Sequence, residues 1–198
     1  LSHQDFVWTI DTSPNGKLFA TACYDKAARL WSLEDGRPVG VAMKHDGPVD
    51  SVAFSPDGTQ LLTASRDRTV RLWDTKTCQP IVAPMRHDEA VLGAIFTPDG
   101  TKILSWGWDG AAYLWNAQAP SWPGEIISVP GQVRSIEFDG NDDRVFVATR
   151  AGQAGLRSLG RKELVTQVAH QRDGISATFL HSPNGHFTPA HVAGILAF

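Results

Sequence analysis

Four chemically active side chains recur in the same order three times along the chain: a histidine, a hydroxyl residue, an aspartate and a tryptophan. The three sets are His3, Thr21, Asp25 and Trp31; His45, Thr63, Asp67 and Trp73; and His87, Ser105, Asp109 and Trp115. A histidine between a hydroxyl group and a carboxylate is the arrangement used for nucleophilic acyl transfer. An enzyme needs that arrangement only once, so its repetition favours a structural role, and we predict no catalytic residues.

The sets follow one another at a constant interval, because Trp31, Trp73 and Trp115 are each 42 residues apart. The prolines at positions 14, 56 and 98 keep the same interval. A fixed period of about 40–45 residues indicates one supersecondary unit used repeatedly. Residues that recur in every copy are therefore expected to build the unit.

The second copy shows what the unit contains. Residues 49–54 predict a strand buried on both faces, and the following Ser-Pro-Asp-Gly at 55–58 predicts a hairpin turn. Residues 61–65 and 69–73, separated by a tight turn, predict the second and third strands. Residues 80–85 predict a weaker fourth strand. Each copy is thus expected to form four short antiparallel strands.

A four-stranded sheet of about 40 residues cannot bury both of its faces alone, but radial stacking of copies solves this problem. We therefore predict an all-β fold, a β-propeller of four-stranded antiparallel blades. About five blades are expected, the last one incomplete, at residues 3–44, 45–86, 87–128, 129–169 and 170–198. The chain opens at a first strand and closes at a third strand, which favours a segment of a longer propeller over a five-bladed ring.

The order of His45, Ser-Pro-Asp-Gly at 55–58 and Ser-Arg-Asp-Arg-Thr-Val-Arg-Leu-Trp-Asp at 65–74 closely resembles a WD repeat. The style of the repeats is similar to bacterial WD-repeat proteins. The resemblance implies that the histidine, hydroxyl, aspartate and tryptophan of each set form a hydrogen-bonded tetrad that holds one blade together. Position 65 and its equivalents are serine, cysteine and glycine, so we assign the hydroxyl role to the position of Thr63.

The resemblance also implies that partners bind the top face of the ring, on residues from the start of each first strand and from the turn before each shared aspartate. The residues predicted to bind a partner are Trp8, Tyr24, Asp50, Arg66, Trp108 and Arg134. The first-strand residues of the four copies are Trp8, Asp50, Leu92 and Arg134. The residues two positions before them are Phe6, Pro48, Ala90 and Gln132. Tryptophan, tyrosine and arginine are enriched in interface hot spots. The alternative is that Trp8 and Phe6 only pack within their strand.

Composition narrows the class of partner. A formal net charge of −3 and a pI near 6.2 argue against nucleic acid and anionic membranes. The two cysteines, Cys23 and Cys78, form neither a disulfide framework nor a metal-binding pattern, which favours a reduced, cytoplasmic location. His181, His186 and His191 do not have the spacing of a metal site. No cofactor, metal or small-molecule substrate is expected.

Together these features predict a non-enzymatic scaffold that binds a protein or peptide on the top face of the propeller. Arg66 and Arg134 would contact an acidic or carbonyl-rich partner. On this interpretation, Trp108→Ala together with Arg66→Ala should weaken partner capture while leaving the melting temperature nearly unchanged. The alternative function is a sensor or regulatory arm of a larger signalling protein, such as a kinase or NTPase.

Overall fold

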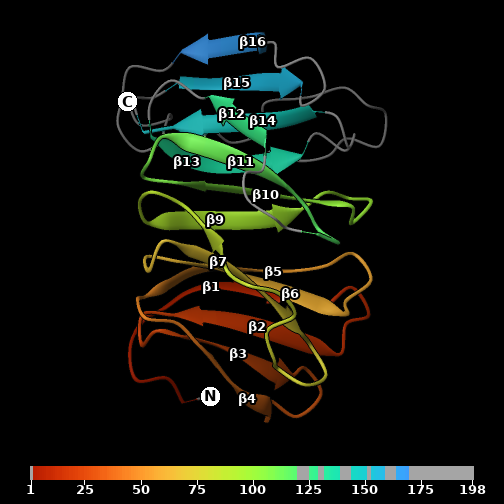
Figure 1. Cartoon of the computed structure of the whole chain (residues 1–198). Helices are drawn as coiled ribbons and strands as arrows, with labels where there is room; N and C mark the ends of the chain where they lie inside the picture. Colours follow the sequence, from red (N-terminus) through yellow and green to blue (C-terminus); the bar gives the residue numbers. More distant parts are fainter. Residues whose placement is uncertain are drawn as a thin grey trace, which may run out of the picture.

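The computed structural model describes residues 2–119, 125–128, 132–138, 144–150, 153–158 and 164–169. The regular secondary structure within these ranges consists of β-strands alone, and the strands form four separate four-stranded antiparallel sheets. In each sheet the strands lie side by side in chain order. The all-β fold predicted from the sequence is therefore confirmed, and the sheets follow one another from the N-terminus as propeller blades do (Figure 1).

The strand bounds repeat closely from sheet to sheet. The first sheet contains β1 (Val7–Thr12), β2 (Leu18–Cys23), β3 (Ala27–Ser32) and β4 (Pro38–Lys44). The second contains β5 (Val49–Phe54), β6 (Gln60–Ser65), β7 (Thr69–Asp74) and β8 (Met85–Arg86). The third contains β9 (Val91–Phe96), β10 (Lys102–Gly107), β11 (Ala111–Asn116) and β12 (Glu125–Ser128). The fourth contains β13 (Val133–Phe138), β14 (Arg144–Thr149), β15 (Gln153–Ser158) and β16 (Leu164–Ala169).

The fourth strand of the second sheet differs from the prediction. Instead of a strand over 80–85, β8 consists of Met85–Arg86, preceded by a single bridge between Trp73 and Pro80. Pro80 and Pro84 have no N–H to donate to a strand ladder, which explains why regular pairing is lost between them. The fifth predicted copy, 170–198, lies outside the described residues.

The predicted hairpin turns form as the sequence requires. Gly58 donates its N–H to the Ser55 carbonyl at 2.8 Å and has a φ of +72°, a conformation that glycine adopts without a Cβ penalty. The Ser55 hydroxyl donates to the Asp57 carboxylate at 2.6 Å, and the backbone N–H of Thr59 donates to the same carboxylate at 3.0 Å. This turn fixes the register of β5 and β6.

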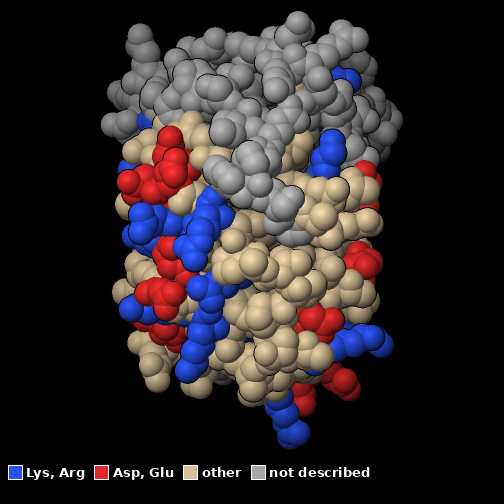
Figure 2. Space-filling view, in the orientation of Figure 1, with Lys and Arg blue, Asp and Glu red and all other residues tan. Residues whose placement is uncertain are grey.

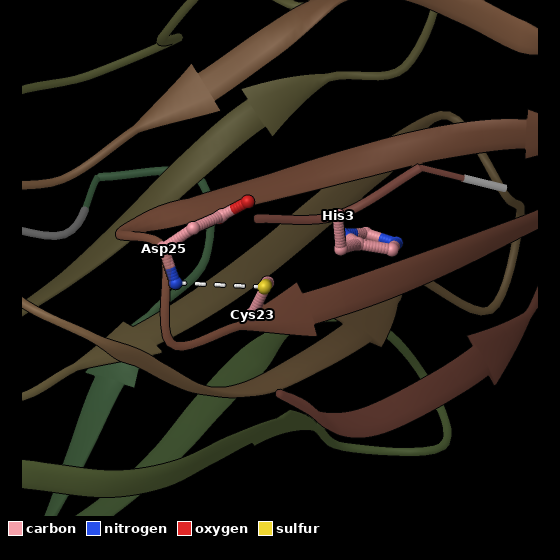
Figure 3. A group of neighbouring side chains, drawn as sticks. All are labelled: His3, Cys23 and Asp25. Atoms are coloured by element: carbon pink, nitrogen blue, oxygen red, sulfur yellow. Dashed lines mark hydrogen bonds between the residues drawn. The ribbon is translucent and has the colours of Figure 1, made fainter. Parts of the chain in front are cut away.

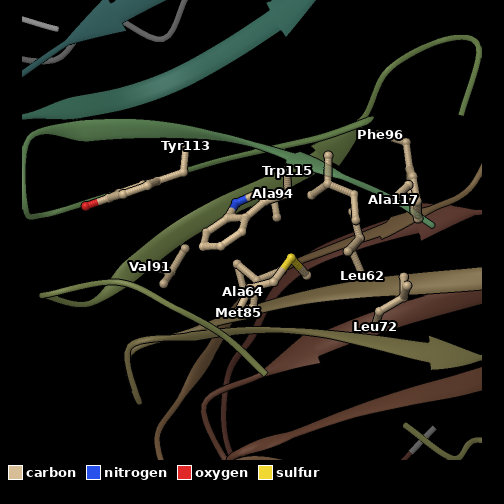
Figure 4. Close-up of a cluster of buried hydrophobic side chains, with 12 residues drawn as sticks. Leu62, Ala64, Leu72, Met85, Val91, Ala94, Phe96, Tyr113, Trp115 and Ala117 are labelled. Carbon is tan, nitrogen blue, oxygen red and sulfur yellow. The ribbon is translucent and has the colours of Figure 1, made fainter. Parts of the chain in front are cut away.

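The core lies between successive sheets. Val49, Val52 and Phe54 of β5 pack on a cluster from the first sheet that includes Leu30 and Met43. The same arrangement recurs one sheet later, where β9 packs on the second sheet (Figure 4). Burial of these apolar faces against their neighbours supplies the main driving force for stacking.

The described strands do not close into a ring, and the first and fourth sheets lie at opposite ends of Figure 1. Among the described residues, β1 has no sheet before it. Val7 and Ile10, which correspond to the buried Val49 and Val52, are consequently 41% and 66% exposed. The described part of the chain contains no helix with the length and apolar character needed to cross a membrane.

Candidate partner-binding face

A β-bulge occurs at the same place in all four sheets. Pairing between the first and second strands shifts by one residue immediately after a valine, at Val7, Val49, Val91 and Val133. The extra residues, which we call the bulge positions, are Trp8, Asp50, Leu92 and Arg134. A bulge releases one residue from the ladder and re-aims its side chain. The first-strand residues singled out in the sequence are therefore set apart from the regular pairing.

A backbone hydrogen bond places a second set of residues beside each bulge. The N–H groups of Tyr24, Arg66, Trp108 and Arg150, the turn positions, donate to the carbonyls of Phe6, Pro48, Ala90 and Gln132 at 2.8–2.9 Å. Each of these carbonyls belongs to the residue two before a bulge position. The turn positions, the bulge positions and these four residues together form what we call the binding face. Arg150 was not among the residues predicted from the sequence. Its place 42 residues after Trp108 could have identified it as the turn position of the fourth copy.

Arg66 joins three sheets at the centre of this face. Its guanidinium carbon lies 4.7 Å from the centroid of the Tyr24 ring of the first sheet and 5.4 Å from that of the Trp108 ring of the third. Its Nε–H donates to Asp50 Oδ2 at 2.8 Å within the second sheet. Trp8 extends the cluster, with its ring 5.8 Å from that of Tyr24. Five of the six predicted partner-binding residues are thus brought together.

Asp50 is the buried anchor of the cluster. Its side chain is 2% exposed, and Oδ1 has no hydrogen-bond partner among the described residues. Burial raises the pKa of Asp50, and the hydrogen bond from Arg66 partly offsets that effect. In turn, the bond to Asp50 raises the pKa of Arg66. The sequence suggested that Asp50 contacts a partner. In the structure its buried carboxylate forms an ion pair with Arg66.

Arg134 is not part of this cluster. It is exposed at the bulge of the fourth sheet, and its backbone carbonyl accepts a hydrogen bond from Trp106 Nε1 at 3.3 Å. The aromatic members are strongly exposed for their size: Phe6 is 78%, Trp8 61% and Trp108 39% exposed. The face therefore offers apolar rings on the first and third sheets and arginines on the second and fourth.

The second and third sheets contain a complete hydrogen-bonded tetrad. His45 Nδ1 is 2.8 Å from Asp67 Oδ2, and His45 Nε2 is 2.7 Å from the Thr63 hydroxyl. Trp73 Nε1 donates to the same hydroxyl at 2.8 Å. The third sheet repeats these contacts at 2.9, 2.7 and 2.8 Å with His87, Asp109, Ser105 and Trp115. Both histidine nitrogens are engaged and the hydroxyls are fully buried, so neither set is open to a substrate.

The first sheet departs from the predicted tetrad. Trp31 Nε1 donates to the Thr21 hydroxyl at 2.9 Å, but His3 does not join them. Arg29 Nη1 lies 3.2 Å from His3 Nδ1 and 3.0 Å from Asp25 Oδ1, while His3 Nε2 is buried without a described partner. In the second sheet the equivalent arginine, Arg71, also contacts its aspartate at 3.3 Å, yet His45 Nδ1 keeps its own contact with Asp67 at 2.8 Å. In the first sheet, Arg29 bridges the histidine and the aspartate instead.

His3, Cys23 and Asp25 come close enough to be considered as metal ligands, with their ligand atoms within 4.8 Å of one another (Figure 3). Two observations oppose this role. The Arg29 guanidinium already places a positive charge on the Asp25 carboxylate at 2.9 Å. Burial also raises the pKa of the Cys23 thiol, whereas metal binding requires the thiolate. We assign no metal to this cluster.

Comparison with known proteins identifies the class. The family model described as "WD domain, G-beta repeat" matches residues 1–32, 36–74 and 79–116, more than half of the chain. The chain therefore belongs to the WD-repeat family, whose repeats generally mediate protein–protein interaction.

Individual relatives match over a stretch about as long as one repeat. The chain is similar to eukaryotic translation initiation factor 3 subunit I from Aspergillus niger, with 41% identity over 39 residues, and from Neosartorya fischeri, with 46% identity over 39 residues. Each match covers 20% of this chain and 12% of the relative. The aligned part is thus a small fraction of those proteins.

Proposed function

We propose that this protein is a non-enzymatic scaffold that binds a protein or peptide partner on the binding face. The observation that carries the proposal is the cluster of Trp8, Tyr24, Arg66 and Trp108, assembled from three different sheets. Tryptophan, tyrosine and arginine are enriched among the hot spots of protein interfaces. Because the three sheets and buried Asp50 fix these side chains, little conformational entropy remains to be lost on binding.

The tetrads support the face without taking part in recognition. In the second and third sheets they tie the loop before the first strand to the second strand, the following turn and the third strand. We infer that their role is structural. Assembly with other subunits is consistent with the similarity to subunit I of a translation initiation factor, whose name places that relative in a multi-subunit complex.

Nucleic acid and membrane surfaces fit this protein less well than a protein partner. On the side shown in Figure 2, lysine and arginine side chains lie next to aspartate and glutamate rather than forming a broad basic area. The formal net charge is −3. Cys23 and Cys78 are both buried thiols, as expected of a protein in the reducing cytoplasm, which is the location we propose.

Selection from a library of short random peptides on the full-length protein tests the proposal. Selected peptides are then measured by fluorescence anisotropy against the wild type, Trp8→Ala and Trp108→Ala. We expect each change to weaken binding about tenfold or more, as removal of a hot-spot aromatic does. Val41→Ala, which truncates an exposed apolar side chain on β4, is the control and should leave affinity unchanged. Equal affinities for all four proteins would place the binding site elsewhere.

A further inference from the structure

The binding face has a charge opposite in sign to that of the whole chain. Its turn and bulge positions include Arg66, Arg134 and Arg150 but only one acid, Asp50. Since Asp50 and Arg66 form an ion pair, the uncompensated positive charge at these positions comes from the exposed Arg134 and Arg150. The chain as a whole carries a formal net charge of −3. The positive sign is therefore local to the surface on which the aromatic cluster also lies.

The guanidinium of Arg66 is preorganised for binding an anion. Two aromatic rings flank its guanidinium, and the Nε–H is bound by Asp50, so the orientation of the group is fixed from three directions. The side chain nevertheless remains 31% exposed, which leaves it accessible to a partner. A planar guanidinium is well suited to a carboxylate, and its prior ordering lowers the entropic cost of that contact.

The same geometry disfavours a cationic partner. Exposed aromatic rings often bind an ammonium or guanidinium group from a ligand. Here the rings of Tyr24 and Trp108 already lie against the Arg66 guanidinium. A cation from a partner would have to displace Arg66, and Asp50 would then be a buried charge without its counter-ion.

The fourth sheet extends the positive area. The N–H of Arg150 donates to the Gln132 carbonyl at 2.8 Å, two residues before Arg134, so the two arginines start from adjacent backbone segments. Both residues are exposed. Two acids limit the positive area on the other sheets, because exposed Asp5 and Glu89 directly precede Phe6 and Ala90 of the face. A long polyanion would meet these acids, whereas a peptide with a few carboxylates would not.

We propose that the partner is a peptide segment in which an acidic side chain follows or precedes a large apolar one. The carboxylate pairs with Arg66, the apolar side chain packs on Trp8 and Trp108, and any further acid contacts Arg134 or Arg150. This inference rests on the proposed function and specifies the chemistry that the face selects.

The test uses sets of matched peptides on the full-length protein. Starting from peptides selected on the binding face, each Glu or Asp beside an apolar residue is replaced by Gln or Asn, by Lys, or by phosphoserine. Fluorescence anisotropy at low and high NaCl then gives the affinities. We expect the carboxylate peptides to bind about tenfold more tightly than their amide counterparts, and this preference to shrink in high salt. Lysine peptides should bind more weakly still.

Three variants assign the preference to particular arginines. Arg134→Gln and Arg150→Gln are exposed changes that should each reduce the affinity of peptides with a second acid about two- to fivefold. Arg66→Lys retains the positive charge beside Asp50 but loses the planar guanidinium, and should remove most of the acid preference. Arg37→Gln, at an exposed turn distant in sequence from the face positions, is the matched control and should have no effect.

The outcomes separate the two proposals. Equal binding of carboxylate and amide peptides, or preference for lysine, overturns the acidic-partner inference while binding that depends on Trp8 still supports the face. Preference for phosphoserine over every carboxylate also overturns it, in favour of a phosphorylated partner. If no selected peptide depends on Trp8 or Trp108, the proposed function fails and this inference fails with it.

Discussion

The indole N–H of Trp73 donates to the Thr63 hydroxyl at 2.8 Å, across the pair formed by β6 and β7. The same hydroxyl lies 2.7 Å from His45 Nε2, so one oxygen satisfies two buried neighbours. Because the Asp67 carboxylate can only accept, a neutral histidine with its proton on Nδ1 satisfies all four groups. The loop before β5 is thereby fastened to the third strand of its sheet.

Thr63→Val should therefore destabilise the protein by about 1–3 kcal/mol, because it leaves buried polar groups of both Trp73 and His45 without a partner. The matched variant is Thr21→Val in the first sheet, where the hydroxyl serves Trp31 but not the histidine. Urea denaturation should show a smaller loss for Thr21→Val. Equal losses would mean that the histidine contact contributes little.

Trp73→Ala should cost about 3–5 kcal/mol, as expected for truncation of a large buried side chain. Trp73 is 5% exposed and packs in the cluster between the first and second sheets. Trp108→Ala provides the comparison, since Trp108 is 39% exposed and mainly loses its contact with Arg66, worth about 0.5–1 kcal/mol. Similar unfolding free energies for the two variants would contradict the assignment of one tryptophan to the core and the other to the face.

Arg66→Met should destabilise the fold by about 2–3 kcal/mol because Asp50 loses its counter-ion. This is less than the ~3–5 kcal/mol typical of fully buried pairs, since Arg66 is partly exposed. Adding Asp50→Asn should recover most of the loss by removing the buried charge. Chemical denaturation of the single and double variants measures this recovery, and a double variant no more stable than Arg66→Met would show that the ion pair is unimportant.

Acid should destabilise the protein below about pH 4, and Asp67 should contribute to this loss. Burial alone would raise the pKa of Asp67, but hydrogen bonds from His45 and Thr69 outweigh it and hold the pKa below the ordinary value of 3.8. The unfolded chain then binds more protons than the folded one, so the contribution of Asp67 is complete above the ordinary pKa and is lost as pH falls below it. Asp67→Asn should flatten the dependence of unfolding free energy on pH between 5 and 3, in a range set by that pKa. An unchanged slope would exclude Asp67 as a source.

Gly93→Ala should destabilise the third sheet by about 1–3 kcal/mol, because a Cβ at this position would collide with the Trp106 ring. The double variant Gly93→Ala/Trp106→Leu should be more stable than Gly93→Ala alone, since leucine leaves room for the added methyl group. Thermal unfolding of both variants tests the pair. No recovery would indicate that Gly93 is needed for another reason.

The period of 42 residues was enough to predict the sheets and the first three strands of the second copy, because each of these strands and turns depends on nearby residues. It could not predict that Arg29 bridges His3 and Asp25, because the equivalent Arg71 leaves the contact between His45 and Asp67 in place. It also could not show that Arg66 neutralises Asp50. The sequence-based expectation of an unchanged melting temperature on loss of Trp108 and Arg66 is therefore replaced by a predicted destabilisation. The bulges remained hidden because pairing register depends on two strands at once.

Most strand residues must both pair with the neighbouring strand and present a suitable side chain, and the bulges separate these two requirements. The residue that pairs with the second strand is always valine, at positions 7, 49, 91 and 133. The bulge residue that follows it differs from sheet to sheet: it is tryptophan, aspartate, leucine or arginine. A residue outside the register can change its size and charge without disturbing the ladder on either side. Where the bulge residue is exposed, as at Trp8 and Arg134, a single substitution can thus change the surface chemistry of one blade without altering its strand pairing, which makes the fold suitable for altering binding specificity one blade at a time.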